Sequence, residues 1–157
     1  MLDRQIPELV AETPPPAETI VVEKVAARLF RMRDGRPYRS NPVALGANPR
    51  GHKQRPGDGR TPEGRYVIDE RRNDSQHCKA LRISYPNAED RRLATACGED
   101  PGSMITVHGQ PNGMGWVGWF TRRFNWTNGC IGVGSVAMEE IWWAVGDGTP
   151  IETRPRC

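Results

Sequence analysis

The stretch NWTNGCIGV, residues 125–133, places a cysteine directly after a glycine in a run too rich in turn-forming residues for a buried core. A thiol is a strong nucleophile only as thiolate, and a nearby imidazole can accept its proton. The stretch SMITVHG, residues 103–109, predicts a strand that ends at His108, again beside a glycine. Cys130 and His108 are therefore a candidate nucleophile and base, with Gly129 and Gly109 allowing close approach of a substrate.

A purely structural interpretation of the same residues stays open at this point. Free cysteine is among the most buried residue types, and a single histidine is often only a hydrogen-bonding residue. In the catalytic interpretation, backbone N–H groups around Gly129 and Cys130 can hold an oxyanion.

Composition limits the classes of protein to which the chain can belong. Its 157 residues are enough for one domain. Apolar residues make up 36%, and 17 glycines with 14 prolines favour short strands joined by many turns. The net charge of +3 comes without a dense basic run, which argues against a nucleic-acid partner.

Targeting signals are missing from the sequence pattern. We expect no transmembrane helix, because no run of eighteen apolar residues occurs. The N-terminal residues lack the basic and apolar segments of a signal peptide. The chain is therefore expected either to be cytosolic or to have lost a leader.

The order of patterns along the chain predicts a mostly β domain with one or two short helices. Residues 1–18, which include PPP, predict a flexible tail, and residues 19–157 the folded domain. A long polar loop is expected at 46–65. Asn87 and Ser135 are the expected helix N-caps. Strands are expected at 19–32, 38–46, 65–71, 78–85, 103–109 and 149–155, and helices at 86–96 and 135–146.

The residues around the candidate pair resemble the active-site motif of the YkuD-type L,D-transpeptidases. That motif is His-Gly, a spacer, and Ser/Thr-x-Gly-Cys-Ile/Val. Further stretches between residues 20 and 155, among them GDGRTPEGRYVID (57–69) and RISYPN (82–87), are similar to this family and especially to its YafK-like proteobacterial branch. The resemblance implies the L,D-transpeptidase β-sandwich. The matching motif residues are His108, Gly109, Thr127, Gly129, Cys130 and Ile131.

Two positions depart from the commoner family pattern. Asn128 stands where many members have histidine, and Gly132 where many have arginine. The YafK-like branch departs at the same two places. Without that arginine, the substrate carboxylate needs another cation, and Arg122 or Arg123 can supply it in a bidentate contact. The alternative is that both are solvated surface arginines.

The resemblance implies two-step acyl transfer on peptidoglycan stem peptides. Cys130 attacks the carbonyl of an L-centre to D-centre bond, and His108, oriented by the Gly109 carbonyl, carries the proton to the leaving amine. An amine or water then resolves the thioester. The YafK-like branch implies release of an outer-membrane lipoprotein from peptidoglycan. The family resemblance also implies acylation by carbapenems, a periplasmic or cell-envelope location, and neither metal nor cofactor.

Several other residues have paired interpretations. Thr127 and Asn128 are candidate substrate contacts, and Thr127 is equally a turn cap. Trp116 and Trp119 either wall a cleft or pack against the sheet. Trp142 and Trp143 are expected in or near the core. His52 and His77 are taken as surface residues, and a Cys78–Cys97 disulfide is conceivable in an oxidising compartment.

Two other function classes compete with the enzyme. A non-catalytic peptidoglycan-binding module of the same fold would explain Gly132, but such a module needs neither Cys130 nor His108. A cytosolic redox or metal protein would need a resolving cysteine or a third ligand, and no spacing in the sequence suggests one.

Overall fold

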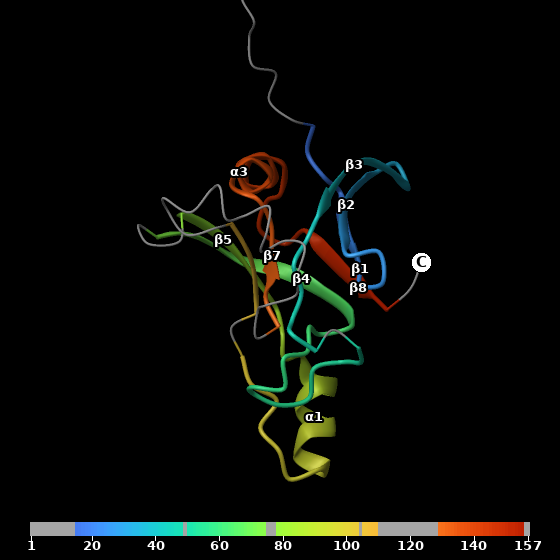
Figure 1. The fold of residues 1–157 in the computed structure, drawn as a ribbon, viewed down its shortest axis with the longest axis vertical. Helices are drawn as coiled ribbons and strands as arrows, with labels where there is room; N and C mark the ends of the chain where they lie inside the picture. Colours follow the sequence, from blue (N-terminus) through green and yellow to red (C-terminus); the bar gives the residue numbers. More distant parts are fainter. Residues whose placement is uncertain (1–14, 49, 75–77, 104, 110–128, 156–157) are drawn as a thin grey trace, which may run out of the picture.

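The computed structural model describes residues 15–48, 50–74, 78–103, 105–109 and 129–155. They form a curled, mostly β structure, which confirms the expected fold class (Figure 1). The strands lie in the order β3-β2-β1-β8-β4-β5-β6-β7. The elements are β1 (Thr19–Glu23), β2 (Arg28–Arg33), β3 (Arg36–Pro42), β4 (Gly64–Asp74), β5 (Cys78–Ile83), α1 (Ala88–Ala96), β6 (Thr106–His108), β7 (Ile131–Gly132), α3 (Ser135–Ala144) and β8 (Pro150–Arg154).

The region expected as one strand at 19–32 is two. Strands β1 and β2 pair antiparallel, from Glu23 opposite Arg28 to Thr19 opposite Met32. The turn between them holds Ala27 at a φ of +51°. Strands β2 and β3 form the expected hairpin, in which Asp34 and Gly35 both have positive φ, at 53° and 73°. Two positive φ values are what a tight type I′ hairpin turn requires.

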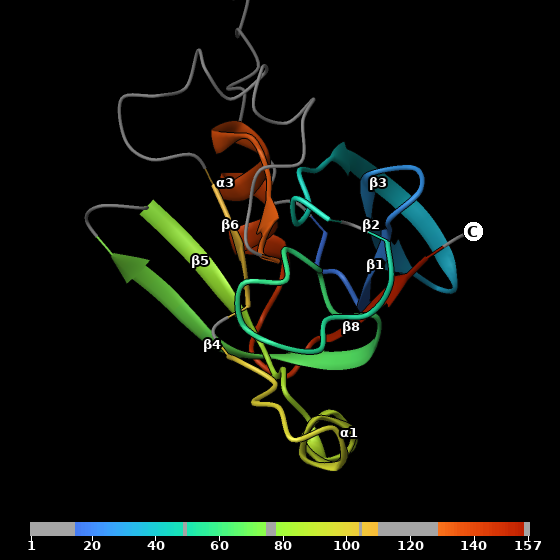
Figure 2. The ribbon, with the colours of Figure 1, turned by 60° about the horizontal axis from the view of Figure 1, so that its bottom comes forward.

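Strand β4 belongs to both halves of the sheet. Residues Gly64–Val67 pair with β8, whereas Ile68–Asp74 pair with β5. A register shift between Ile68 and Glu70 marks the change of partner. Irregularities of this kind bend a strand and increase its twist. The long strand therefore carries the sheet round a corner, as Figure 2 shows.

The two ends of the curled sheet meet. Ala44, just after β3, exchanges two backbone hydrogen bonds of 2.8 Å with Gly132 in β7. Strand β7 also pairs in parallel with β6 on its other side. Closure of this kind leaves β7 with backbone partners on both edges.

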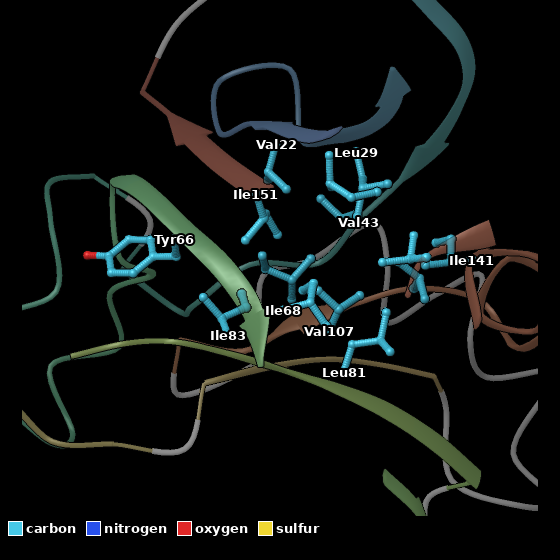
Figure 3. Close-up of a cluster of buried hydrophobic side chains, with 14 of the residues drawn as sticks. Val22, Leu29, Val43, Tyr66, Ile68, Leu81, Ile83, Val107, Ile141 and Ile151 are labelled. Atoms are coloured by element: carbon cyan, nitrogen blue, oxygen red, sulfur yellow. The ribbon is translucent and has the colours of Figure 1, made fainter. Parts of the chain in front are cut away.

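One apolar cluster fills the inside of the curled sheet (Figure 3). Ile68 and Val22 are fully buried, and Leu81, Val107 and Ile151 are 1% exposed. Val67, the neighbour of Ile68, is 39% exposed. The alternation follows the two-residue period of strands, so each strand contributes one face to the common core.

Helix α1 follows the sequence prediction closely. The side chain of Asn87, the N-cap, accepts a 2.9 Å hydrogen bond from Asp90 N, and the Asp90 carboxylate accepts one from Asn87 N. This reciprocal arrangement is a capping box. Cys97 follows the helix as an exposed cysteine that is free of a disulfide in this structure.

Helix α3 departs from the prediction at two points. Its N-cap is Gly134, without a side-chain hydrogen bond, and Ser135 is already helical. Met138 and Ile141 are buried as expected, but Trp143 is 61% exposed and its indole donates to Glu139. The apolar stripe faces the core, and Trp143 lies off it. In Figure 1, α3 and α1 lie at opposite ends of the molecule.

The long polar loop is confirmed, since no described residue between 47 and 63 lies in a strand or helix. A buried polar side chain links two points of the loop to the sheet. The Lys24 ammonium, at the end of β1, donates to the carbonyls of Gly51 and Thr61. Neither α1 nor α3 is long and apolar enough to cross a membrane.

Ile68→Ala should destabilise the domain by about 2–5 kcal/mol, because truncation of a fully buried side chain loses apolar burial and leaves a cavity. Urea unfolding measures this loss as a lower midpoint. Val67→Ala on the exposed face is the matched control and should cost less than about 1 kcal/mol. Equal losses in the two variants would contradict the assigned faces of β4.

Candidate active site

The pairing of β6 with β7 brings the candidate nucleophile and base together. Val107 pairs with Ile131 and His108 with Gly132, in parallel. Val107 and Ile131 are both buried, at 1% and 0% exposure. Since side chains alternate along a strand, Thr106 and His108 lie on the opposite face of β6. Cys130, one residue before β7, is placed beside them.

Hydrogen bonds fix the protonation pattern of this trio. His108 Nδ1 lies 2.9 Å from the carbonyl oxygen of Gly109, which can only accept, so Nδ1 carries a proton. That contact leaves Nε2 to act as the basic nitrogen. The side chains of His108 and Cys130 are hydrogen-bonded to each other, and Thr106 Oγ1 donates to Cys130 Sγ at 3.7 Å. Thr106 was missed in the sequence, although its position two residues before His108 placed it on the same strand face.

The pKa values of the pair move toward each other. Burial alone raises the pKa of Cys130, but hydrogen bonds from His108 and Thr106 outweigh it and lower the pKa below the ordinary thiol value. Burial alone lowers the pKa of His108, but its contacts with Cys130 and the Gly109 carbonyl outweigh it and raise the pKa. Each group favours the charged form of the other. The site therefore stabilises a thiolate beside an imidazolium.

Gly129 is required by the backbone at this point. Its φ is +121°, and a Cβ atom would lie 2.5 Å from the carbonyl oxygen of Arg60. Residues with side chains rarely adopt such a φ, and the distance is well inside van der Waals contact. Arg60 in the long loop therefore packs closely against Gly129, the residue before the candidate nucleophile Cys130.

Cys130 lines a cavity of about 700 Å³. The walls come from the long loop, from α1, and from residues 100–103 and 105, which lead into β6. A volume in this range accommodates a small ligand or a short peptide segment. The lining residues are Lys53, Pro56, Gly57, Pro86, Arg91, Thr95, Asp100, Pro101, Gly102, Ser103, Ile105 and Cys130.

His52, expected as a surface residue, joins the loop to α1. Its Nε2 lies 2.8 Å from Asp90 Oδ1, and the Glu63 backbone N–H donates to its Nδ1 at 2.8 Å. Since Nδ1 accepts, the proton lies on Nε2 and is donated to Asp90. The Tyr66 hydroxyl donates to the other oxygen of the same buried carboxylate at 2.8 Å. Because these contacts are long-range, no local pattern revealed them.

The structure places only some of the candidate site residues. Cys130, His108, Gly109 and Gly129 lie together. No group of three or more potential metal ligands occurs among the described residues. The remaining candidates lie outside the described residues: Trp116, Trp119, Arg122, Arg123, Thr127 and Asn128.

Comparison with known families decides the assignment of the chain. The model of the L,D-transpeptidase catalytic domain, YkuD, matches residues 17–153. The chain belongs to the YkuD family. The resemblance seen in the sequence is thereby confirmed for the family, and its YafK-like branch stays a prediction.

Solved structures share the YkuD fold with this chain. Pgp2, the helical cell shape determining protein from Campylobacter jejuni, has a TM-score of 0.67 and 23% identity over 88% of this chain and 48% of its own. An L,D-transpeptidase from Mycobacterium smegmatis has a TM-score of 0.58 and 17% identity, covering 87% and 58%. LdtMt1, in complex with imipenem, has a TM-score of 0.58 and 19% identity, again covering 87% and 58%. This YkuD chain spans about half the length of these proteins, and no curated protein matches it.

Gly129→Ala should destabilise the domain and slow alkylation of Cys130, because the new methyl group meets the Arg60 carbonyl and the φ is strained. The expected loss of stability is about 1–3 kcal/mol. Gly146→Ala is the matched control, since a Cβ there meets nothing within 4 Å. Urea unfolding and alkylation rates report both effects. A Gly129→Ala variant as stable as the control would contradict the close packing.

Alkylation of Cys130 by iodoacetamide should reach half its maximal rate at a pH below the ordinary thiol pKa of about 8.5. A lowered pKa means that thiolate is already present at lower pH, and the rate rises as pH increases through that pKa. His108→Gln should move the midpoint upward and slow the reaction at neutral pH. Mass spectrometry of the Cys130 peptide measures the rate, with the exposed Cys97 as internal reference. An unchanged midpoint in the variant would exclude the ion pair.

Proposed function

We propose that this chain is a cysteine peptidyltransferase that acts on peptidoglycan stem peptides at L-centre to D-centre bonds. The observation that carries the proposal is the Cys130–His108 pair, with a thiol of lowered pKa opening on a cavity, in a domain of the YkuD family. Membership of the family supports the substrate class, and the pair supports the use of a covalent thioester.

The first step forms an acyl-enzyme. The Cys130 thiolate attacks the peptide carbonyl of the L-residue, and backbone N–H groups at Gly129 and Cys130 stabilise the oxyanion. The imidazolium of His108 gives its Nε2 proton to the departing D-amino acid as the C–N bond breaks. The Gly109 carbonyl keeps the ring in place through Nδ1. The products are a thioester at Cys130 and a neutral His108.

The second step reverses the proton transfer. His108 Nε2 takes a proton from the incoming nucleophile, which attacks the thioester and expels the Cys130 thiolate. An amine from another stem gives a crosslink, an amine of an outer-membrane lipoprotein gives attachment, and water gives trimming or lipoprotein release. We propose that the reaction takes place in the cell envelope, on the periplasmic side, where such substrates lie.

A non-catalytic binding module of the same fold is the second candidate. The absence of arginine at Gly132 favours it. The mutual pKa shifts of Cys130 and His108 favour the enzyme, because binding alone needs no activated thiol.

Cys130→Ala should abolish turnover while the fold and peptide binding remain. Incubation with tetrapeptide muropeptides, and with sacculi that carry attached lipoprotein, separates crosslinked, trimmed and released products by mass. The wild type should also gain the mass of imipenem at Cys130. Cys97→Ala is the control and should keep both activities, since its thiol lies outside the Cys130–His108 contact. A wild type with neither turnover nor adduct, but with intact muropeptide binding, would leave only the binding module.

A further inference from the structure

The charged residues that line the cavity with Cys130 differ in whether they form ion pairs. Lys53, Arg91 and Asp100 are the charged residues among the lining set. Lys53 Nζ lies 3.0 Å from Asp58 Oδ1, and both side chains are almost completely buried, at 3% and 5% exposure. This ion pair is internal to the loop and leaves no net charge for a ligand.

Asp58 is held as a carboxylate by its own loop. Burial raises its pKa, but backbone N–H donors from Gln54, Arg60 and Arg55, together with Lys53, outweigh burial and lower the pKa to about 2. Lys53 is therefore matched by a carboxylate that is ionised at neutral pH. The pair shapes the cavity wall and does not recruit substrate.

Arg91 has a different environment. It lies on α1 one turn before Thr95, and both line the cavity, as expected for residues four apart on a helix. Its neighbour Arg92 is on another face and forms an ion pair with Glu89. The adjacent Asp90 carboxylate is already occupied by His52, Tyr66 and Asn87. Among the described residues, none forms an ion pair with Arg91.

Asp100 is not an ion-pair partner of Arg91 either. Its Oδ1 accepts the Gly102 backbone N–H at 2.8 Å, within its own turn, and it forms no ion pair with a described residue. The cavity thus has an exposed guanidinium on the α1 wall, at Arg91, and a carboxylate on another wall, at Asp100. Cys130 lines the same cavity. A substrate carboxylate is attracted to the first wall and repelled by the second.

We propose that Arg91 binds a free carboxylate of the peptide whose carbonyl Cys130 attacks, and so determines which stem peptides are accepted. The proposal rests on the function proposed above. Guanidinium groups bind carboxylates through two parallel hydrogen bonds, and Gly132 in β7 provides no cation. The class of substrate is a peptide with an unamidated carboxyl group at a distance from the scissile bond.

The test compares peptides and variants in pairs. Turnover is measured for the wild type, Arg91→Gln and Arg91→Lys. One set of substrates is stem tetrapeptides with free carboxylates, and the other is the same peptides with each carboxylate amidated in turn. Arg92→Gln is the matched control, since it removes an equal charge one residue away from the cavity. Iodoacetamide alkylation of Cys130, which involves no carboxylate, checks that the nucleophile is intact in every variant.

Arg91→Gln should raise KM for the free-acid peptide about tenfold with kcat within about twofold, and Arg91→Lys should restore part of the affinity. The peptide amidated at the carboxylate that Arg91 binds should be a poor substrate for the wild type. Arg91→Gln should not lower its turnover further. Alkylation rates should agree within about twofold in all variants. Equal KM values for Arg91→Gln and Arg92→Gln on the free-acid peptide would overturn the role of Arg91 and leave the proposed function standing.

Failure of the proposed function has a different signature. If the wild type turns over no peptide, calorimetric binding to Cys130→Ala still decides the role of Arg91. Tighter binding of the free-acid than the amidated peptide, lost on adding Arg91→Gln, would support it. Equal binding of the two peptides would overturn it.

Discussion

The parallel pairing of β6 with β7 is the constraint on which the site depends. It is only two residue pairs long, Val107 with Ile131 and His108 with Gly132, and such a short ladder is weak on its own. The two hydrogen bonds between Gly132 and Ala44 hold the far edge of β7, and the burial of Val107 and Ile131 anchors its inner face. Closure of the curled sheet thus helps to hold Cys130 beside His108.

Electrostatics in this site are a balance between burial and pairing. Burial disfavours both the thiolate of Cys130 and the imidazolium of His108. Together they offset that cost, and Thr106 and the Gly109 carbonyl add hydrogen bonds to the charged forms. Pairing outweighs burial for both groups, since the pKa of Cys130 is lowered and that of His108 is raised. Removing His108 should therefore raise the pKa of Cys130, and removing Cys130 should lower that of His108, which is why the pH profile is an informative measurement.

Local patterns predicted the parts of the structure that local physics determines. The period of two located most strands, and Asn87 was recognised as a cap from its position. Glycine neighbours and a motif singled out His108 and Cys130, which the structure brings together, and their catalytic role stays a proposal. Features made by distant contacts were missed. The switch of β4 between β8 and β5, the bond from His52 to Asp90 across 38 residues, and the burial of Arg31 against Glu140 have no short-range signal. Trp143 was placed near the core because its neighbours are apolar, although it lies off the buried stripe.

The Cys130–His108 pair and the rest of the cavity wall come from different parts of the fold. Cys130, His108 and Thr106 are fixed by strands in the closed sheet, whereas the cavity wall is built from a long loop, α1 and the segment before β6. Asp90 links the loop to α1 by accepting from His52, and it also accepts from Tyr66 in β4. Under the proposed function, residues that line the cavity on these walls, such as Arg91, are expected to tolerate substitution without loss of the Cys130–His108 contact. Under the proposed function, a pair that forms the thioester and a separate wall that selects the peptide would allow one fold to serve different stems and acceptors.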